Sequence, residues 1–252
     1  MIRLKTVDQI GRIREACQLT ARLMNSLPAF LEPGMSTYTI DKFCYDFMIA
    51  HKVKPAFLGY EGFPATACIS INEEVIHGIP TKDRLLAEGD LVDIDLGINL
   101  DGHFSDMART FIIGETKKEW EQLCTVTQRC LSLGIEAAGK KGARIQDISS
   151  AVYKLANSKG YGVVRDYCGH GVGLAVHEEP SVPNYVSSYM ANPRIREGMV
   201  LAIEPMINLG TKNTRTLENG WTVVTSDGKP SVHFEDTIAI TKNGLEILTV
   251  EA

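Results

Sequence analysis

The sequence has no long hydrophobic run, no block of basic residues and no paired cysteine motif. No apolar stretch approaches the length that spans a bilayer, and the start, MIRLKTVDQIGRIREA, carries charges where a signal peptide has an apolar segment. We therefore expect a cytoplasmic protein without a membrane partner. The net charge of −5 includes no basic cluster. This balance argues against DNA or RNA as a general partner and favours a small or peptide substrate.

The six cysteines show neither CxxC pairs nor zinc-ribbon spacing, which excludes zinc-finger chemistry and predicts reduced, mostly buried thiols. They stand at positions 17, 44, 68, 124, 130 and 168. With 252 residues, of which 44% are hydrophobic and 23% charged, the chain is long enough to bury a sizeable core. The composition is that of an ordinary globular protein, either one large domain or two small ones.

Helical periodicity occurs in two pairs of segments. A first helix begins after Thr6, which has capping-box spacing with Gln9, and ends before Pro33-Gly34. Amphipathic stripes predict three more helices, over residues 40–48, 120–137 and 145–155. Short β-branched runs fill the segment from about 67 to 113, where LVDIDLGINL and HFSDMARTFII flank Asp101-Gly102 as in a hairpin. Strands resume near Val163, so the order helix, helix, strands occurs twice.

The two halves of the chain resemble each other. EGDLVDIDLGINL aligns with EGMVLAIEPMINL at an offset of 109, with six identical positions of thirteen, and this places Asp95 on Glu204. Upstream, Gly34 matches Gly142 at an offset of 108. The repeat predicts an α/β (α+β) fold with pseudo-two-fold symmetry, in which halves of approximately 1–115 and 116–252 form a single catalytic domain, 1–252. A central cleft between the halves would receive an acidic residue from each.

Two aspartates of the hairpin are expected to lie on one face. If the turn is centred on Asp101-Gly102, cross-strand partners have numbers that sum to 203, and Asp106 then faces Gly97. Asp95 becomes its diagonal neighbour, with Cβ atoms up to about 7–8 Å apart. Without a cation or a proton the two carboxylates would repel, so a bound metal is favoured over a purely structural role. Asp93 shares this face and stays open as an alternative ligand.

Further ligand-type residues come from the second half. The repeat supplies Glu204, GHGVGLAVHEEP supplies His170, and VHFEDTIAI supplies Glu235 after a second hairpin turn expected at Asp227-Gly228. Four carboxylates and one imidazole form an oxygen-rich set that suits Mn²⁺, Fe²⁺ or Co²⁺ in a two-metal site. Such a pair of ions predicts hydrolysis.

The other histidines divide into two groups. His177 lies seven residues after His170 and is expected near the metal site, whereas His77 fits a structural role at a strand end as well as a functional one. We assign no functional role to the remaining three, which are His51, His103 and His233.

Five motifs in order resemble the type I methionine aminopeptidases, in their short bacterial form, of the M24 or pita-bread family. They are NEEVIHGIP, LVDIDLGINLDGHFSD, GHGVGLAVHEEP, MVLAIEP and HFED, and together they span nearly the whole chain. The resemblance implies the pita-bread fold, with antiparallel sheets lining a central cleft and helices outside. It also implies a dinuclear site with Asp106 and Glu235 as bridging ligands. The full ligand set it implies is Asp95, Asp106, His170, Glu204 and Glu235.

The resemblance further implies removal of the initiator methionine from nascent proteins, favouring a small second residue. A metal-bridging hydroxide would attack the carbonyl, Glu204 would handle the proton, and His77 and His177 would bind the substrate and stabilise the tetrahedral intermediate. By the same resemblance, the methionine pocket is formed by Phe57, Tyr60, Phe63, Cys68, Val176 and Trp221.

The chain departs from the family pattern in two places. Family members usually have a small residue in place of Phe57 and a large aromatic in place of Val176, so the two exchanges offset in volume and keep a methionine-sized pocket plausible. Their usual Gln-x-Glu-His appears here as HFED, which puts Asp236 directly after the ligand Glu235 and leaves the tuning of the metal open.

Several expectations and alternatives stay open. The ions are Co, Mn or Fe, with Zn or Ni as alternatives, and family members suggest a monovalent Na or K ion near Asn72 and Ser231. Association with the ribosome is open, and we expect a monomer. The nearest alternative activity is a pita-bread peptidase that cleaves before proline, although such enzymes usually carry an additional N-terminal domain. The other alternative is a metal-free binding module of the same fold. Such a protein should have lost its metal ligands, but all five expected ligands are present here.

Overall fold

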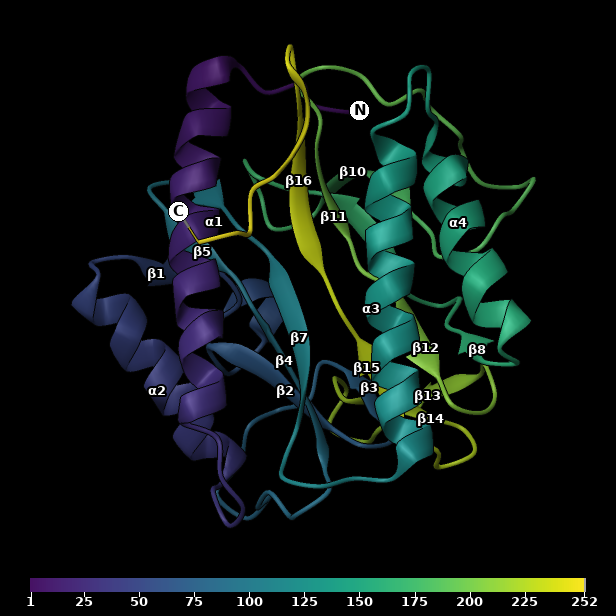
Figure 1. Cartoon of the computed structure of the whole chain (residues 1–252). Coiled ribbons are helices and arrows are strands. Elements are labelled where there is room, and N and C mark those ends of the chain that lie inside the picture. Colours follow the sequence, from purple (N-terminus) through teal and green to yellow (C-terminus); the bar gives the residue numbers. More distant parts are fainter. Residues whose placement is uncertain (252) are drawn as a thin grey trace.

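Four α-helices lie on the outside of a set of antiparallel sheets in the computed structural model, which describes residues 1–251 (Figure 1). The helices are α1 (Val7–Ser26), α2 (Thr37–Ala50), α3 (Lys118–Ala138) and α4 (Ile145–Ser158), with short 3-10 turns η1 (Leu27–Ala29) and η2 (Tyr60–Gly62). All four expected helices are confirmed. The capping box at Thr6 and Gln9 is formed, and it satisfies backbone N–H groups that the first turn of α1 would otherwise leave unpaired.

The strands are short and fall into five sheets. The first half contains β1 (Lys54–Pro55), β2 (Ala67–Ile71), β3 (Glu74–Ile76), β4 (Leu91–Leu96), β5 (Ile98–Leu100), β6 (His103–Phe104) and β7 (Met107–Ile112). The second half contains β8 (Gly162–Val163), β9 (Gly169–Gly171), β10 (Glu178–Val182), β11 (Val200–Ile203), β12 (Met206–Asn208), β13 (Thr214–Thr216), β14 (Val223–Thr225), β15 (Ser231–His233), β16 (Asp236–Thr241) and β17 (Gly244–Ile247). The site described below rests on the sheets β2-β4-β7 and β10-β9-β11-β16-β17.

The register of the first hairpin is confirmed. β4 pairs with β7 so that Asp95 lies opposite Ala108, and β5 pairs with β6 so that Leu100 lies opposite His103. The numbers of the partners sum to 203 in each case, as the turn at Asp101-Gly102 predicts. Asp106 stands between β6 and β7, directly before the strand that pairs with β4.

The internal repeat also appears in the structure. α2 and α4 each have 14 residues and start 108 positions apart, while β4 and β11 start 109 apart. An isolated bridge joins Ser36 to Leu85 in the first half, and its counterpart joins Arg144 to Arg194 in the second. β4 lies between β2 and β7, just as β11 lies between β9 and β16. The architecture is therefore α/β with antiparallel sheets, as predicted.

Apolar side chains form one large core under each half and a smaller one between them. The smaller core joins Ile10, Ile13 and Cys17 of α1 to Val200 of β11 and Ala239 of β16. Full burial of an aliphatic side chain such as Ile13 stabilises the fold by about 1.5–3 kcal/mol. Because α1 also contributes Ala16, Leu23 and Met24 to the core of the first half, this helix packs against both halves.

The prediction of a hairpin at Asp227-Gly228 is wrong. A turn occurs there, but β14 pairs with β13 and β3, whereas β15 pairs with β12 in a separate sheet. A bond from Thr225 Oγ1 to the Lys229 carbonyl closes the turn, and Ser231 N then donates to the Asn72 carbonyl in the first half. The flanking strands thus find partners elsewhere, which turn residues alone do not reveal.

Two expectations from composition can be compared directly with the structure. All six cysteines are free thiols, and five of them are buried while Cys168 is half-buried. None of the helices within residues 1–251 is both long and apolar enough to cross a bilayer.

Candidate active site

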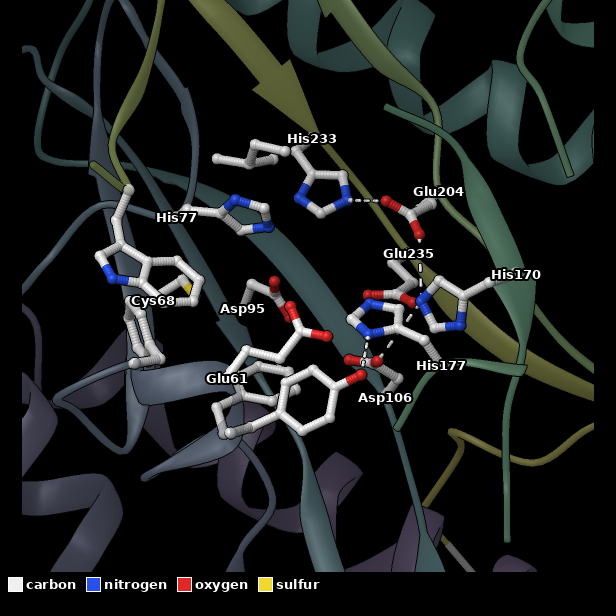
Figure 2. Close-up of a pocket in the computed structure, with 15 residues that line it drawn as sticks. Glu61, Cys68, His77, Asp95, Asp106, His170, His177, Glu204, His233 and Glu235 are labelled. Carbon is white, nitrogen blue, oxygen red and sulfur yellow. Dashed lines mark hydrogen bonds and ion pairs between the residues drawn. The ribbon is translucent and has the colours of Figure 1, made fainter. Parts of the chain in front are cut away.

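A cavity of about 110 Å³ opens where the sheets of the two halves meet (Figure 2). One side of it carries ionisable groups, and the other is apolar. Its lining consists of Phe57, Tyr60, Glu61, Phe63, Cys68, Ile76, His77, Asp95, Asp106, His170, His177, Glu204, Trp221, His233 and Glu235.

The five expected ligands converge on this cavity from separate strands. Asp95 belongs to β4, Asp106 precedes β7, His170 belongs to β9, Glu204 follows β11 and Glu235 precedes β16. Ligand atoms of Asp106, His170 and Glu235 lie within 4.8 Å of one another. His170 Nε2 is also 3.4 Å from Glu204 Oε1. Residues more than a hundred positions apart therefore form one compact cluster.

Steric constraints require the glycines on either side of His170. β9 runs between β10 and β11, and a Cβ at Gly169 would collide with the Ala202 carbonyl oxygen, while one at Gly171 would collide with that of Glu179. The close approach fixes the backbone on both sides of the imidazole. His170 Nδ1 lies 2.9 Å from the Gly171 carbonyl oxygen, and a proton held there leaves the lone pair of Nε2 facing the cluster.

Burial disfavours the charged state of these carboxyl groups when no counter-ion is present. Desolvation, followed by repulsion from neighbouring carboxylates, raises the pKa of Asp106 and Glu235 well above the ordinary range. Desolvation also raises the pKa of Asp95 to about 8. Asp95 Oδ1, Asp106 Oδ1 and Glu235 Oε1 are buried without a hydrogen-bond partner within the described chain. Unpartnered buried oxygens beside an imidazole nitrogen fit a site for divalent cations.

His233 lines this cavity. The prediction that it has no functional role is therefore corrected. Its Nε2 lies 3.7 Å from Glu204 Oε2 and its Nδ1 lies 3.3 Å from Asp93 Oδ2 (Figure 2 labels His233 and Glu204). Burial opposes the charged state of Glu204, but His233 and His170 outweigh it and lower the pKa of that carboxyl. The departure from Gln in the HFED motif was the available signal, since it put an ionisable group two residues from a ligand.

Asp93 does not line the cavity. Its Oδ2 faces His233 and its Oδ1 lies 3.4 Å from Thr110 Oγ1, which in turn donates to the His233 carbonyl oxygen. The residue left open as an alternative ligand is thus the partner of a cavity histidine.

His77 and His177 lie at the entrance to the cluster from different loops. His177 Nδ1 is 3.0 Å from the Tyr60 hydroxyl, and its ring packs edge-on against that of His170. Desolvation and the neighbouring His170 lower the pKa of His177 to about 4. Desolvation lowers the pKa of His77 as well. Both imidazoles are therefore neutral near pH 7.

The backbone of His77 is held in an uncommon conformation. Its φ is +58°, in the left-handed region, and a Cβ on the following Gly78 would collide with the Ile69 carbonyl group. Strained positions of this kind are concentrated at functional sites. Its ring packs edge-on against Tyr167 and Trp221, which directs it toward the cavity.

The apolar side of the cavity contains most of the expected methionine pocket. Phe57, Tyr60, Phe63, Cys68 and Trp221 line it, and the rings of Phe63 and Trp221 pack edge-on at 5.2 Å. Val176 belongs to the same apolar cluster but does not line the cavity. Its small side chain lies behind the wall, so it shapes the pocket through its neighbours. Ile76 and Glu61 also line the cavity, although no motif predicted a role for them.

The charge of Asp236, beside the expected ligand Glu235, is neutralised locally. Its Oδ1 accepts from Arg109 Nη2 at 2.6 Å and from Thr249 Oγ1 at 2.7 Å. Arg109 Nη1 also donates to the carbonyl oxygens of Ala108 and Glu235. The aspartate is therefore paired with a cation that ties together the segments carrying Asp106 and Glu235.

Comparisons with known proteins agree with this architecture. The model of metallopeptidase family M24 matches residues 11–242. The methionine aminopeptidase of Treponema pallidum is 50% identical over 249 residues, which cover 99% of this chain and 96% of the relative. The crystal structure of the methionine aminopeptidase of Thermotoga maritima matches with a TM-score of 0.95 at 40% identity and covers both chains fully. The prolidase of Pyrococcus furiosus matches with a TM-score of 0.79 at 25% identity, over 99% of this chain and 66% of the prolidase.

Proposed function

Because this chain belongs to metallopeptidase family M24 and is a methionine aminopeptidase with the pita-bread fold, we propose that it removes the initiator methionine from nascent proteins whose second residue is small. The observation that carries the proposal is the cavity itself. Ligand-type atoms of Asp106, His170 and Glu235 converge in a cavity whose other side is apolar. We also propose that the halves 1–115 and 116–252 act as a single catalytic domain.

The donor set fits two divalent ions. We propose that Asp95, Asp106, His170, Glu204 and Glu235 would hold them. Three of the carboxylates have a buried oxygen without a partner in the described residues, which a cation would satisfy. The dominance of oxygen ligands favours Mn²⁺, Fe²⁺ or Co²⁺ over Zn²⁺ or Ni²⁺.

A monovalent Na or K ion near Asn72 and Ser231 is a further part of this proposal. Ser231 N donates to the Asn72 carbonyl oxygen at 2.9 Å, and Ser231 Oγ is buried without a hydrogen-bond partner within residues 1–251. A small cation at this junction would be coordinated by oxygens from both halves.

Divalent ions bound here would supply a hydroxide nucleophile at neutral pH and would polarise the scissile carbonyl group. Glu204 is suited to proton transfer because its pKa is lowered by the nearby histidines, so the carboxylate is ready to accept a proton. It would return that proton to the departing amine. The neutral His77 and His177 would donate hydrogen bonds to the substrate and to the oxygen that becomes negative in the tetrahedral intermediate.

The apolar wall accounts for the choice of methionine. Phe57, Phe63, Cys68 and Trp221 present carbon and sulfur atoms to an unbranched thioether, and Tyr60 fixes His177 at its edge. Thioethers contact aromatic rings favourably. Val176 supports this wall from behind, as part of the same cluster.

Cleavage of three peptides tests the proposal. Metal-stripped protein is mixed with Met-Ala-Ser, Met-Lys-Ser or Ala-Pro-Ser, Mn²⁺, Fe²⁺ or Co²⁺ is added back, and products are identified by mass spectrometry with a metal-free control. We expect only the first peptide to lose its first residue, and only with metal. Cleavage of the proline peptide instead would show a prolidase-type specificity. Absence of cleavage with every metal would favour a binding module.

We further propose that the protein acts in the cytoplasm as a monomer and meets its substrates as they leave the ribosome. An N-terminal methionine has an apolar side chain and a charged amine, which would face the apolar and ionic sides of the cavity.

A further inference from the structure

Glu61 is a cavity residue whose charge has no partner in the site. It stands between Tyr60 and Gly62 in the loop that forms the outer rim, and its side chain lines the pocket (Figure 2). It is exposed, and its carboxylate makes neither a hydrogen bond nor an ion pair with any residue from 1 to 251. The rim therefore presents an uncompensated negative charge.

The loop holds this charge in place. Glu61 has φ +49° and ψ +19°, a left-handed conformation that is uncommon for a residue with a side chain. Gly59 N donates to the Phe63 carbonyl oxygen at 2.8 Å, and Phe63 N donates to that of Tyr60 at 2.9 Å, so the turn is closed at both ends. Tyr60 is anchored on His177 and Phe63 on Trp221. The backbone at Glu61 is fixed by groups on either side.

Glu61 carries a negative charge that the expected metal ions would not balance. Two divalent ions would balance the four carboxylates of the proposed ligand set, and Glu61 is not part of that set. Those four carboxylates lie deep in the cavity, whereas Glu61 lies at its mouth. A peptide with methionine against Phe63 and Trp221 must leave through that mouth. Its third and fourth residues would then approach the exposed Glu61, whose carboxylate can act on their charge.

We propose that Glu61 is a specificity-determining residue that favours peptides with Lys or Arg at the third or fourth position and disfavours Asp or Glu there. This inference rests on the proposed function and names a subset of its substrates. Attraction between a substrate cation and the carboxylate raises productive binding, and repulsion of an acidic side chain lowers it. Because the interaction lies at the exposed rim, salt screens it.

The test compares the cleavage of Met-Ala-Lys-Ser, Met-Ala-Gln-Ser and Met-Ala-Glu-Ser at saturating Mn²⁺. We expect kcat/KM of wild-type protein to be about fivefold higher for the Lys peptide than for the Glu peptide at low salt. Glu61→Gln should bring this ratio close to one, and Glu61→Lys should invert it. The matched control Glu32→Gln removes an exposed carboxylate that does not line the cavity and should leave the ratio unchanged. Raising the salt to about 1 M should reduce the ratio in wild type.

Two results would overturn the inference alone. An unchanged ratio in Glu61→Gln would show that the carboxylate does not sense substrate charge. An equal loss on all three peptides would show instead that Glu61 binds their common N-terminus. If wild-type protein cleaved none of the three, the proposed function would fail and this inference with it.

Discussion

The imidazole of His233 lies between two carboxylates, those of Asp93 and Glu204, and only Glu204 lines the cavity. Asp93 faces its Nδ1 and Glu204 faces its Nε2, while Thr110 donates to its backbone carbonyl oxygen. A proton held on Nδ1 by Asp93 or on Nε2 by Glu204 fixes the ring, and the ring limits the orientations of the Glu204 carboxylate. Partners that orient a metal ligand affect the site as strongly as many ligands do.

Replacement of His233 should therefore act mainly on turnover. We expect His233→Leu to lower kcat for Met-Ala-Ser by about 10- to 100-fold with a smaller change in KM, because Glu204 loses its partner and Asp93 is left buried and alone. His233→Gln keeps a side-chain donor and should retain most of the activity.

Steady-state kinetics at saturating Mn²⁺ measures this effect, with thermal unfolding recorded for each variant. The control His51→Leu removes an exposed imidazole on α2 and should leave kcat unchanged. Equal losses in the Leu and Gln variants would refute the positioning role of His233.

At the scale of elements, the two halves meet where β7 approaches β16. These strands belong to separate sheets, and Arg109 ties their segments together through the Asp236 carboxylate and the Glu235 carbonyl group. Glu235 N also donates to the Ala108 carbonyl oxygen at 2.9 Å. Arg109 and this backbone hydrogen bond thus both help to fix the relative position of Asp106 and Glu235.

Loss of Arg109 should destabilise this junction more than loss of an exposed arginine. We expect Arg109→Met to lower the free energy of unfolding by about 2–3 kcal/mol, because Asp236 is left largely buried without its partner. Arg14→Met breaks the more exposed pair with Glu246 and should cost about 1 kcal/mol or less.

Urea unfolding of the metal-free proteins measures both values. The double variant Arg109→Met with Asp236→Leu should recover part of the loss, since no unpaired charge is left. Equal costs for the two arginines would contradict the role given to Arg109.

At the scale of the whole molecule, the repeat made most of the architecture predictable. Offsets of 108 and 109 placed α2 on α4 and β4 on β11 because both halves bury the same pattern of apolar residues. The hairpin register followed from one turn for the same reason, since a shift by one residue would expose the buried face. The motifs therefore sufficed to predict that five acidic and imidazole side chains line one cavity.

Other features could not be predicted because they depend on packing between segments distant in sequence. The HFED motif signalled an ionisable group near Glu235, but it could not show that His233 lies between Asp93 and Glu204. Val176 lies behind the wall because its neighbours fill the space in front of it. Glu61 reaches the rim through a left-handed loop that no periodicity signals.

The stability of the metal-free protein should depend on pH through the buried carboxyl groups. The pKa of Asp95 is 3.8 ordinarily and about 8 in the folded protein, so between these values the folded state holds a proton that the unfolded state releases. Stability from this group is complete below the ordinary pKa and is lost as pH rises toward 8. His177, whose pKa is lowered to about 4, has the opposite effect, but only below about 6.5.

We therefore expect urea unfolding of the metal-free protein to show a loss of stability from about pH 6.5 to 8. Saturating Mn²⁺ should remove or reverse this trend, because the ions take the place of the bound protons. A metal-free protein that becomes more stable over the same interval would contradict the account of the carboxyl cluster.

The central claim, a two-metal site that performs hydrolysis, is tested most directly by titrating Mn²⁺ into metal-stripped protein in a calorimeter. Cleavage of Met-Ala-Ser is assayed at each addition. We predict two bound ions per chain, no cleavage before metal is added and activity that rises as the ions bind, with both properties impaired in Asp106→Asn. Cleavage by metal-free protein, or unaltered binding and cleavage in Asp106→Asn, would contradict it.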